Sequence, residues 1–546
     1  MTLTTTRETE AVTDGRMPIR PPVTRQKITA AIVAALAIAA TIASAVYIEF
    51  DLATLSDGFG SVLNLVERML PPETENPGRI ADLAIETLMI ALLGTVFATI
   101  VSIPLAFLAA QNTTPNRAVY GVARGVIAVC RAVPDLVFAV LLVRAMGIGI
   151  LPGILALALH SIGMLAKLFA EAIERTGTGP REAARSVGVG PVRELVTAVL
   201  PEVVPSWIST FIYRIDINLR TSVVLGFVGA GGIGFALQDS LRGLVYDKAI
   251  GIVLVILGMI VAMELVSIGA RRLLLSSESN PGAPRNLHTV TPPWTRERFA
   301  RLGFGALLVA AIGYAFASLK IDPWQIATSF PAMIEVAGKL LPPHFTLAGD
   351  QLVFAVLETL AIGLVATAAG TVLSVPLGLL AARNVSPHPS VYSGARAVTL
   401  GVRAVPELIM AVIFVAAVGL GPIAGACALA IGSMGFLGKL ISDATEEIDP
   451  GAAEAVRSVG GGWWQVLFAA VLPQLMPALV GSTLYMLDVN IRTSTVLGIV
   501  GAGGVGFLLL EAVRTLNFEF AGAIILIIFA VVYLIERLSG WARSQM

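Results

Sequence analysis

The chain has 546 residues, of which 56% are hydrophobic and 14% charged, and its mean hydropathy is +0.83. Soluble domains carry about 25% charged residues, so this composition excludes an ordinary soluble protein and indicates a polytopic membrane protein. The 37 basic and 37 acidic residues cancel, which leaves no bulk charge for binding nucleic acid. Cys130 and Cys427 lie within apolar segments and predict buried side chains rather than a disulfide framework.

Apolar segments long enough to cross a bilayer, about 20 residues each, recur along the chain. Residues 1–27 are polar and predict a cytoplasmic tail without a cleavable signal. Candidate spans then lie near 28–49, 80–110, 119–146, 150–174, 193–228 and 247–270. Polar residues 273–299 predict a flexible cytoplasmic linker. Further candidates lie near 300–319, 352–382, 391–418, 422–446, 465–500 and 518–540. We therefore predict an all-α membrane protein with about 12 transmembrane helices.

The two halves of the chain repeat each other at one offset. Glu86-Thr-Leu recurs as Glu358-Thr-Leu, and 358 − 86 = 272. The same offset relates the motif that begins at Arg131 to that at Arg403, and the glycine-rich motif at Gly229 to that at Gly501. An ungapped repeat of this length predicts a tandem duplication. The predicted divisions are a tail at 1–27, a first half at 28–272, a linker at 273–299 and a second half at 300–546.

Lysine and arginine gather on one side of the predicted membrane. The tail before the first span carries Arg16, Arg20, Arg25 and Lys27, whereas the next loop, 50–79, is comparatively acidic. The positive-inside rule therefore places the N-terminus in the cytoplasm. Because each half has an even number of predicted spans, the halves enter the membrane in one orientation. They are then parallel repeats about a pseudo-two-fold axis along the membrane normal, a pseudo-dimer within one chain.

A short polar loop occurs once in each half. Residues 181–188 (Arg-Glu-Ala-Ala-Arg-Ser-Val-Gly) recur as 453–460 (Ala-Glu-Ala-Val-Arg-Ser-Val-Gly), and Leu-Pro follows twelve residues after the glycine in both copies. Alanine and glutamate favour helix, and glycine ends one. We predict two short cytoplasmic helices that dock a partner of two-fold symmetry, rather than two ordinary polar loops. The expected docking residues are Glu182, Ala183, Ala184, Gly188, Glu454, Ala455, Val456 and Gly460.

Polar and charged side chains inside the predicted spans are the candidates for a translocation pathway. They are Arg131, Arg403, Asp216, Asn218, Arg220, Asp488, Asn490, Arg492, Ser161 and Ser433. An arginine at the centre of a membrane helix costs roughly 2.5–3.5 kcal/mol on insertion scales, so such residues normally face a pathway or a partner. Local pairing is the alternative, because carboxylates and arginines four residues apart meet on a helix. Pro134 and Pro406 weaken that alternative for Arg131 and Arg403, since proline disturbs the helix there.

The glycine-rich motif of each half matches the dinucleotide-binding pattern G-x-G-x-x-G. Its glycines are Gly229, Gly231, Gly232 and Gly234 in the first half, and Gly501, Gly503, Gly504 and Gly506 in the second. That pattern requires a preceding strand, whereas an apolar helical segment precedes it here, so we exclude nucleotide binding. Two interpretations remain: a helix break near an outer gate, or close packing of small residues between membrane helices.

The sequence contains no motif for a metal site, a catalytic site or an ATP-binding site that could drive transport. The four histidines have no metal-ligand spacing, and no catalytic constellation is present, so we expect neither a metal nor an enzyme. The nearest approach to a phosphate-binding loop, residues 435–440, has the wrong spacing and lacks a serine or threonine after Lys439. ATP and Mg²⁺, if used, therefore belong on another subunit.

The paired polar loops resemble the coupling motif of ABC importer permeases. The wider pattern of Arg-Ala-Val-Pro, Asn-x-Arg-Thr-Ser and the glycine-rich motif resembles the phosphonate transporter permease family over about residues 80–272 and 352–543. The resemblance implies a type I ABC importer permease fold in a bacterial cytoplasmic membrane, embedded in lipid. It also implies a cytoplasmic ATPase dimer, an extracytoplasmic binding protein and a phosphonate or related oxyanion, whose oxygens match guanidinium donors.

Two departures from the family pattern stand out. Such permeases are commonly separate subunits, whereas this chain fuses both halves, and Val456 replaces the second alanine of the motif. A secondary transporter of the major facilitator type also has 12 helices in two parallel halves. That alternative leaves the paired docking loops without a purpose, since it needs no ATPase.

Overall fold

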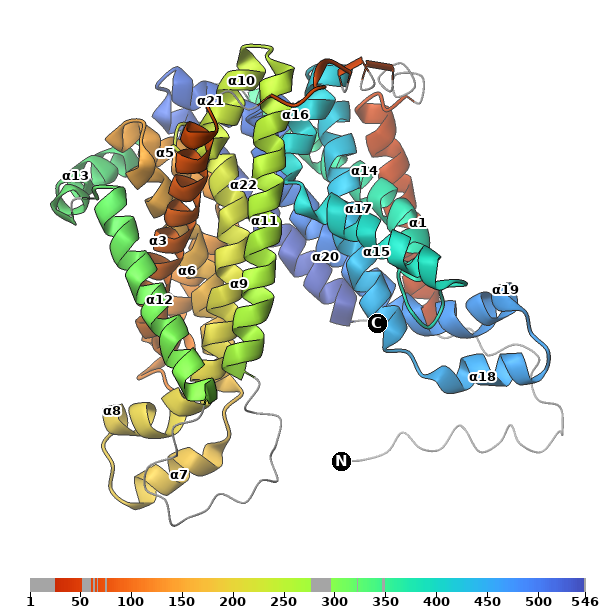
Figure 1. The fold of residues 1–546 in the computed structure, drawn as a ribbon, viewed down its shortest axis with the longest axis horizontal. Helices are drawn as coiled ribbons and strands as arrows, with labels where there is room; N and C mark the ends of the chain where they lie inside the picture. The colour runs from red at the N-terminus through yellow and green to blue at the C-terminus, as the bar shows by residue number, and fades with distance from the viewer. Residues whose placement is uncertain are drawn as a thin grey trace.

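The structure is a computed structural model that describes residues 25–544 apart from 52–59, 62–63, 66, 74–75, 276–295, 322 and 346–348. Within these residues every regular element is a helix (Figure 1), which confirms the predicted all-α class. The predicted tail and linker lie almost entirely outside the described residues.

The two halves contain matching series of helices. In the first half they are α1 (Arg25–Tyr47), α3 (Pro77–Ala109), α4 (Arg117–Ala132), α5 (Asp135–Met146), α6 (Ile150–Glu174), α7 (Thr178–Ser186), α8 (Pro191–Glu194), α9 (Leu200–Gly226), α10 (Ile233–Arg242) and α11 (Tyr246–Leu275). In the second half they are α12 (Arg296–Ser318), α13 (Pro323–Lys339), α14 (Gly349–Leu380), α15 (Pro389–Ala404), α16 (Glu407–Val418), α17 (Pro422–Glu446), α18 (Pro450–Ser458), α19 (Trp463–Val466), α20 (Leu472–Gly498), α21 (Gly504–Arg514) and α22 (Phe518–Ser544). The pairs α3 with α6 and α14 with α17 pack in the same way.

Eight helices among the described residues are long and apolar enough to cross a membrane. Two predicted spans, 119–146 and 391–418, are instead bent pairs, α4 with α5 at 87° and α15 with α16 at 86°. The bends follow from Pro134 and Pro406, because the residue before a proline is disfavoured in a helix. Counting each pair as one span gives up to ten, and the apolar stretches 35–47 and 302–318 are shorter. The predicted number of about 12 is therefore not confirmed.

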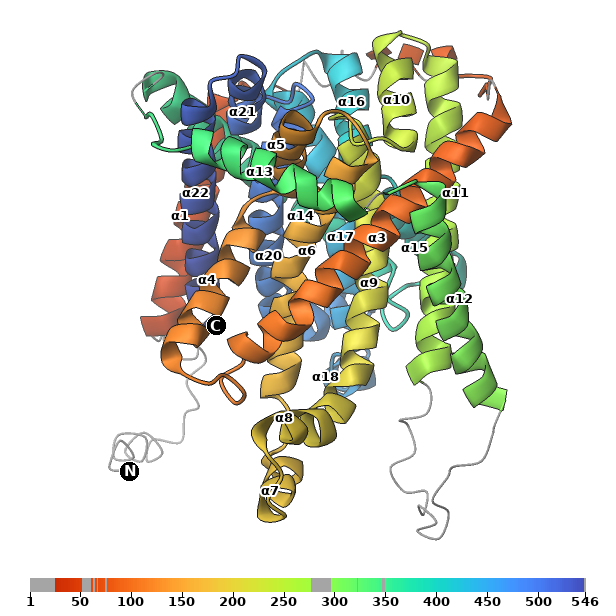
Figure 2. The same ribbon diagram turned by 90° about the vertical axis from the view of Figure 1, so that its left-hand side faces the viewer.

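The first helix of each half packs against the opposite half. α1 packs on α14 of the second half, where the Tyr47 hydroxyl donates to the carbonyl oxygen of Phe354 at 3.3 Å. α12 packs on α3 of the first half, with the rings of Phe97 and Phe316 edge to face at 5.9 Å. Figure 2 shows α12 running alongside α11 and crossing α3. This exchange ties the two halves together.

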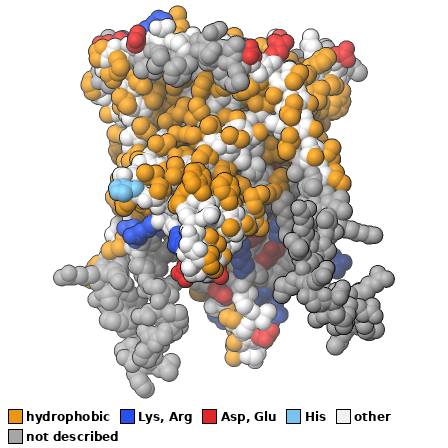
Figure 3. Space-filling view, turned by 90° about the vertical axis from the view of Figure 1, so that its right-hand side faces the viewer, with side chains coloured by type: hydrophobic (Ala, Val, Ile, Leu, Met, Phe, Trp, Pro, Cys, Tyr) orange, Lys and Arg blue, Asp and Glu red, His pale blue; other side chains and the backbone are white. Residues whose placement is uncertain are grey.

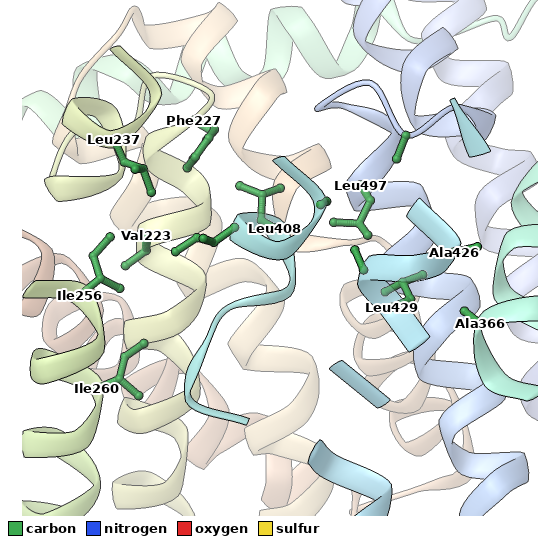
Figure 4. Close-up of a cluster of buried hydrophobic side chains, with 14 of the residues drawn as sticks. Val223, Phe227, Leu237, Ile256, Ile260, Ala366, Leu408, Ala426, Leu429 and Leu497 are labelled. Carbon is green, nitrogen blue, oxygen red and sulfur yellow. The ribbon is translucent and has the colours of Figure 1, made fainter. Parts of the chain in front are cut away.

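A buried apolar cluster fills the seam between the halves. Phe227 and Leu237 of the first half belong to the same cluster as Leu408 and Leu497 of the second (Figure 4). Because lipid is as apolar as leucine, tight packing rather than water exclusion stabilises such a core. Apolar side chains also cover the middle of the face in Figure 3, with charged ones gathered towards its two ends. That distribution is typical of a protein surrounded by a bilayer.

Candidate functional site

The two repeated polar loops form the short helices α7 and α18 at one end of the molecule. α7 lies below the first half and α18 below the second (Figure 1). Gly188 and Gly460 follow them with φ of 76° and 85°. This left-handed conformation suits glycine at a helix end. Glu182 and Glu454 are exposed on the two helices, so their side chains are accessible to a partner.

Ion pairs hold α7 against the helix that follows it. The buried carboxylate of Glu194 accepts hydrogen bonds from Nε of Arg181 and Nε of Arg185, each at 2.8 Å. Hydrogen bonds from Arg185 and Arg181 hold the pKa of Glu194 below its ordinary value. The position of α7 therefore depends on a charge.

Apolar contacts hold α18 instead. At the offset of 272, Ala453 and Val466 stand where the first half has Arg181 and Glu194, and both are buried in one apolar cluster. Trp463 of α19 packs against the same cluster, and its indole Nε1 donates to the carbonyl oxygen of Val385 at 2.7 Å. The repeated motif predicts two equivalent loops. An alignment of the two halves beyond the motif, however, already shows that the ion-pairing residues of the first half are apolar in the second.

Replacing Glu194 by glutamine is expected to loosen α7 and leave α18 in place. Because folding lowers the pKa of Glu194, its ion pairs contribute stability above the unfolded pKa and lose it as pH falls through the folded value. Acidification should therefore act like the substitution. Hydrogen–deuterium exchange should be faster in 178–186 and unchanged in 450–458. Equal changes in both segments would contradict the asymmetry.

Two ion pairs connect the halves near the bends. Arg131 Nη2 lies 2.8 Å from Glu536 Oε1, and Arg403 Nη1 lies 3.8 Å from Glu264 Oε1. Each pair joins one half to the other, and 536 − 264 = 272. The local pairing that we weighed for Arg131 and Arg403 is absent from the described residues, because the chain turns sharply after each arginine. The sequence does contain a feature that could have indicated these pairs. A glutamate occupies the same position in the last predicted span of each half, at Glu264 and Glu536.

The second set of predicted charges does pair locally. Arg220 lies 3.4 Å from Asp216, and Arg492 lies 3.2 Å from Asp488. Arg220 also donates from Nη1 to the carbonyl oxygen of Arg403 at 3.1 Å, which crosses the seam. The Nε atoms of Arg220 and Arg492 are buried without an acceptor among the described residues. Both halves therefore hold a spare guanidinium donor at equivalent positions, 272 residues apart.

The predicted polar residues Asn218, Ser161, Asn490 and Ser433 are buried inside their own halves. Asn218 Nδ2 donates to Thr95 Oγ1 at 2.8 Å and to Ser161 Oγ at 3.0 Å. In the second half Asn490 makes the same bonds to Thr367 and Ser433, both at 2.9 Å. Exposure of each amide and each serine is at most 1%. In this conformation they join three helices, so their contact with a substrate stays a prediction.

The glycine-rich motifs form tight turns between α9 and α10 and between α20 and α21. Glu86 Oε1 accepts from the backbone N–H of Gly232, and Thr87 Oγ1 from that of Ile233, both at 2.8 Å. Glu358 and Thr359 bind the second turn with the same geometry, to Gly504 and Val505.

These turns have no room for side chains. A Cβ on Gly231 would lie 2.8 Å from the Glu86 carboxylate, and one on Gly232 would lie 2.5 Å from Thr87 Oγ1. Gly226 and Gly234 meet backbone to backbone. Close packing therefore accounts for these glycines. Their turns also border the cavity between the halves, so the role at an outer gate stays a prediction.

A cavity of about 870 Å³ lies between the halves at the end opposite α7 and α18. Its wall comes from α5, α10, α16 and α21 and the glycine turns, and it is largely apolar. Arg144, Arg242 and Arg514 are its charged lining residues. Arg144 donates from Nη2 to the carbonyl oxygens of Val513 at 3.2 Å and Arg514 at 3.1 Å. Among the described residues no group of three or more histidine, cysteine or acidic side chains is placed to hold a metal.

Comparison with known proteins gives the same division into two halves. The family of binding-protein-dependent transport system inner membrane components matches residues 102–277 and again 374–540. The phosphate-import permease PhnE of Mycolicibacterium smegmatis is 63% identical over 508 residues, 93% of each chain. The phosphite transport system permease PtxC of Stutzerimonas stutzeri is 44% identical over 217 residues, 40% of this chain and 79% of its own. A solved inward-facing MetNI methionine ABC transporter covers 36% of this chain and 95% of its own at 26% identity, with a TM-score of 0.33.

The two family matches together cover more than half of the chain, and α7 and α18 lie one in each match. They exclude the major facilitator alternative. They also make the chain the membrane component of a transport system and not its enzyme. On this evidence the chain belongs to the family of binding-protein-dependent transport system inner membrane components, as a permease with both halves fused.

Proposed function

We propose that this chain forms the membrane pathway of an ATP-driven importer of phosphate, phosphonate or phosphite. The observation that carries the proposal is its 63% identity to a phosphate-import permease over 93% of both chains. The phosphite permease relative extends the range to other phosphorus oxyanions. Phosphonate, the substrate expected from the resemblance, is therefore one of several phosphorus oxyanions that we propose as substrates.

The pathway runs along the pseudo-two-fold axis, between the central arginines of the two halves. Arg131 and Arg403 are paired across the seam, and Arg220 and Arg492 each keep a buried Nε without an acceptor among the described residues. A guanidinium group offers donors in a fork that matches two oxygens of a phosphorus oxyanion. Because the arginines are duplicated, both halves of the chain supply such donors to the pathway between them.

A cytoplasmic ATPase dimer docks on α7 and α18 and carries the ATP and Mg²⁺. When ATP closes the dimer, the two helices move together and the pathway opens outward, and hydrolysis returns it to face inward. Support comes from their place at the same end, one under each half. A binding protein delivers substrate at the opposite end, above the cavity between the halves.

Twelve spans result if α1 and α12 also cross the bacterial cytoplasmic membrane. Both helices are apolar and pack along long helices of the opposite half. α1 begins at the end of the molecule where α7 and α18 lie (Figure 1). With the ATPase on that side, the N-terminus is cytoplasmic, in agreement with the positive-inside rule.

The test is the ATPase activity of the reconstituted complex with its binding protein added empty or loaded with phosphate, phosphite or methylphosphonate. Stimulation by a loaded form supports both coupling and the substrate class. Stimulation by a different ligand retains the importer but excludes phosphorus oxyanions. If no ATPase associates with the chain, the docking role of α7 and α18 is wrong.

Replacing Arg131 by glutamine is expected to lower uptake roughly tenfold, the effect of losing one hydrogen bond to a charged group. ATPase association should persist, because Arg131 lies outside α7 and α18 and its side chain pairs with Glu536 of α22. Uptake and co-purification of the ATPase are compared in the same preparation. If the substitution only lowers thermal stability and leaves the uptake rate per folded transporter intact, Arg131 is a structural ion-pair partner.

A further inference from the structure

Arg214 of α9 is a buried cation without an ion-pair partner among the described residues. It is 3% exposed. Nε donates to Ser161 Oγ at 2.9 Å and Nη1 to Met164 Sδ at 3.0 Å, both on α6. The carboxylates Asp216, Glu264 and Glu536 pair with other arginines. Most of the five N–H donors of this guanidinium therefore remain available.

The second half has no such charge. The equivalent residue is Met486, since 486 − 214 = 272, and it is 2% exposed. The surrounding polar network is otherwise the same, with Ser433 and Thr367 accepting from Asn490 as Ser161 and Thr95 accept from Asn218. An uncharged side chain thus satisfies the packing at this position, and the fold does not require the arginine.

A lone buried cation costs free energy in a membrane protein, and replacing such a group by an apolar one is often neutral or stabilising. The presence of this charge in the first half therefore points to a ligand of opposite sign. α9 also borders the seam, because Arg220, six residues after Arg214 on this helix, donates to the carbonyl oxygen of Arg403 from the other half at 3.1 Å. Asp135 acts on Arg214 from beyond ion-pair distance.

Resting on the function proposed above, we propose that Arg214 binds the oxygen atoms of the phosphorus oxyanion in transit and is the specificity-determining contact that only the first half makes. The two halves then bind the substrate unequally, although they are duplicates. Ser161 orients the guanidinium through Nε and leaves Nη2 for the anion.

The experiment uses Arg214→Met, which gives the first half the side chain that the second half has. In proteoliposomes with the ATPase and saturating loaded binding protein, phosphate transported per ATP hydrolysed should fall at least about tenfold, the loss of a charge-assisted contact. The ATPase rate should persist, and the unfolding temperature should stay equal or rise. Arg214→Lys should retain part of the transport, and Met486→Leu, the matched control, should change neither quantity.

A second arm identifies the source of the anion. In detergent without phospholipid, inorganic phosphate should raise the unfolding temperature of the original chain more than chloride at the same ionic strength, and Arg214→Met should abolish the difference. Stabilisation by anionic lipid alone would assign Arg214 to a headgroup and overturn the proposal. Unchanged transport by Arg214→Met, or transport lost together with thermal stability, would overturn it too. Failure of the original chain to take up any phosphorus oxyanion would instead refute the proposed function.

Discussion

Replacing Gly234 by alanine is expected to prevent the native packing of α9 on α10. The added Cβ would collide with the carbonyl oxygen of Val223, a backbone atom that no rotamer change can move. Overpacking of a buried site costs typically about 1–3 kcal/mol, and a clash with backbone lies at the upper end or beyond. Gly506, which faces the carbonyl oxygen of Thr495, should behave in the same way. The yield of monodisperse protein and its unfolding temperature measure the effect.

Gly258→Ala is the matched control for this prediction. Gly258 lies in α11, and nothing lies within 4 Å of the Cβ that alanine would add. Alanine favours helix over glycine by about 1 kcal/mol, so this variant should be as stable as the original chain or slightly more so. A Gly234→Ala protein with an unchanged unfolding temperature would show that the two turns are not packed as described.

The double variant Glu182→Ala, Glu454→Ala is expected to lose coupled uptake by at least about tenfold, since truncating a charged contact at an interface costs roughly 2–5 kcal/mol. Both side chains are exposed on α7 and α18, and exposed substitutions usually change stability by only about 0.5 kcal/mol. The ATPase should therefore dissociate from an intact permease. Co-purification of the ATPase and the unfolding temperature are the two measurements.

Glu447→Ala provides the control on the same face of the molecule. Glu447 is exposed and follows α17 directly, but it lies outside both α7 and α18. Its removal should leave uptake and ATPase association intact. Normal coupled uptake in the double variant would remove the docking role from these glutamates.

Much of the fold follows from the sequence because the chain is duplicated. One offset of 272 places α7 and α18, the glycine turns, and the arginines Arg131 and Arg220 with their equivalents Arg403 and Arg492. Apolar length alone locates most long helices, since a membrane span needs a fixed run of residues. The bends at Pro134 and Pro406 follow from local backbone sterics, although apolar length alone predicts one continuous span for each bent pair.

Contacts between distant parts of the chain were less predictable. The helical rule that brings residues four apart together applies to Asp216 with Arg220, but it cannot find the pair of Arg131 with Glu536, 405 residues away. The rule likewise cannot show that Glu86 and Thr87 bind the turn before α10. Their repetition as Glu358 and Thr359 indicates that both halves need these residues, but it does not identify the backbone groups that they bind.

The most direct test of the central claim is ATP-dependent accumulation of radiolabelled phosphate in proteoliposomes that contain this chain, its ATPase and its binding protein. We predict uptake that requires all three components and ATP, and that unlabelled phosphite or methylphosphonate inhibits if the binding protein accepts them. Uptake by the chain alone, driven by a proton gradient and indifferent to ATP, would contradict the account.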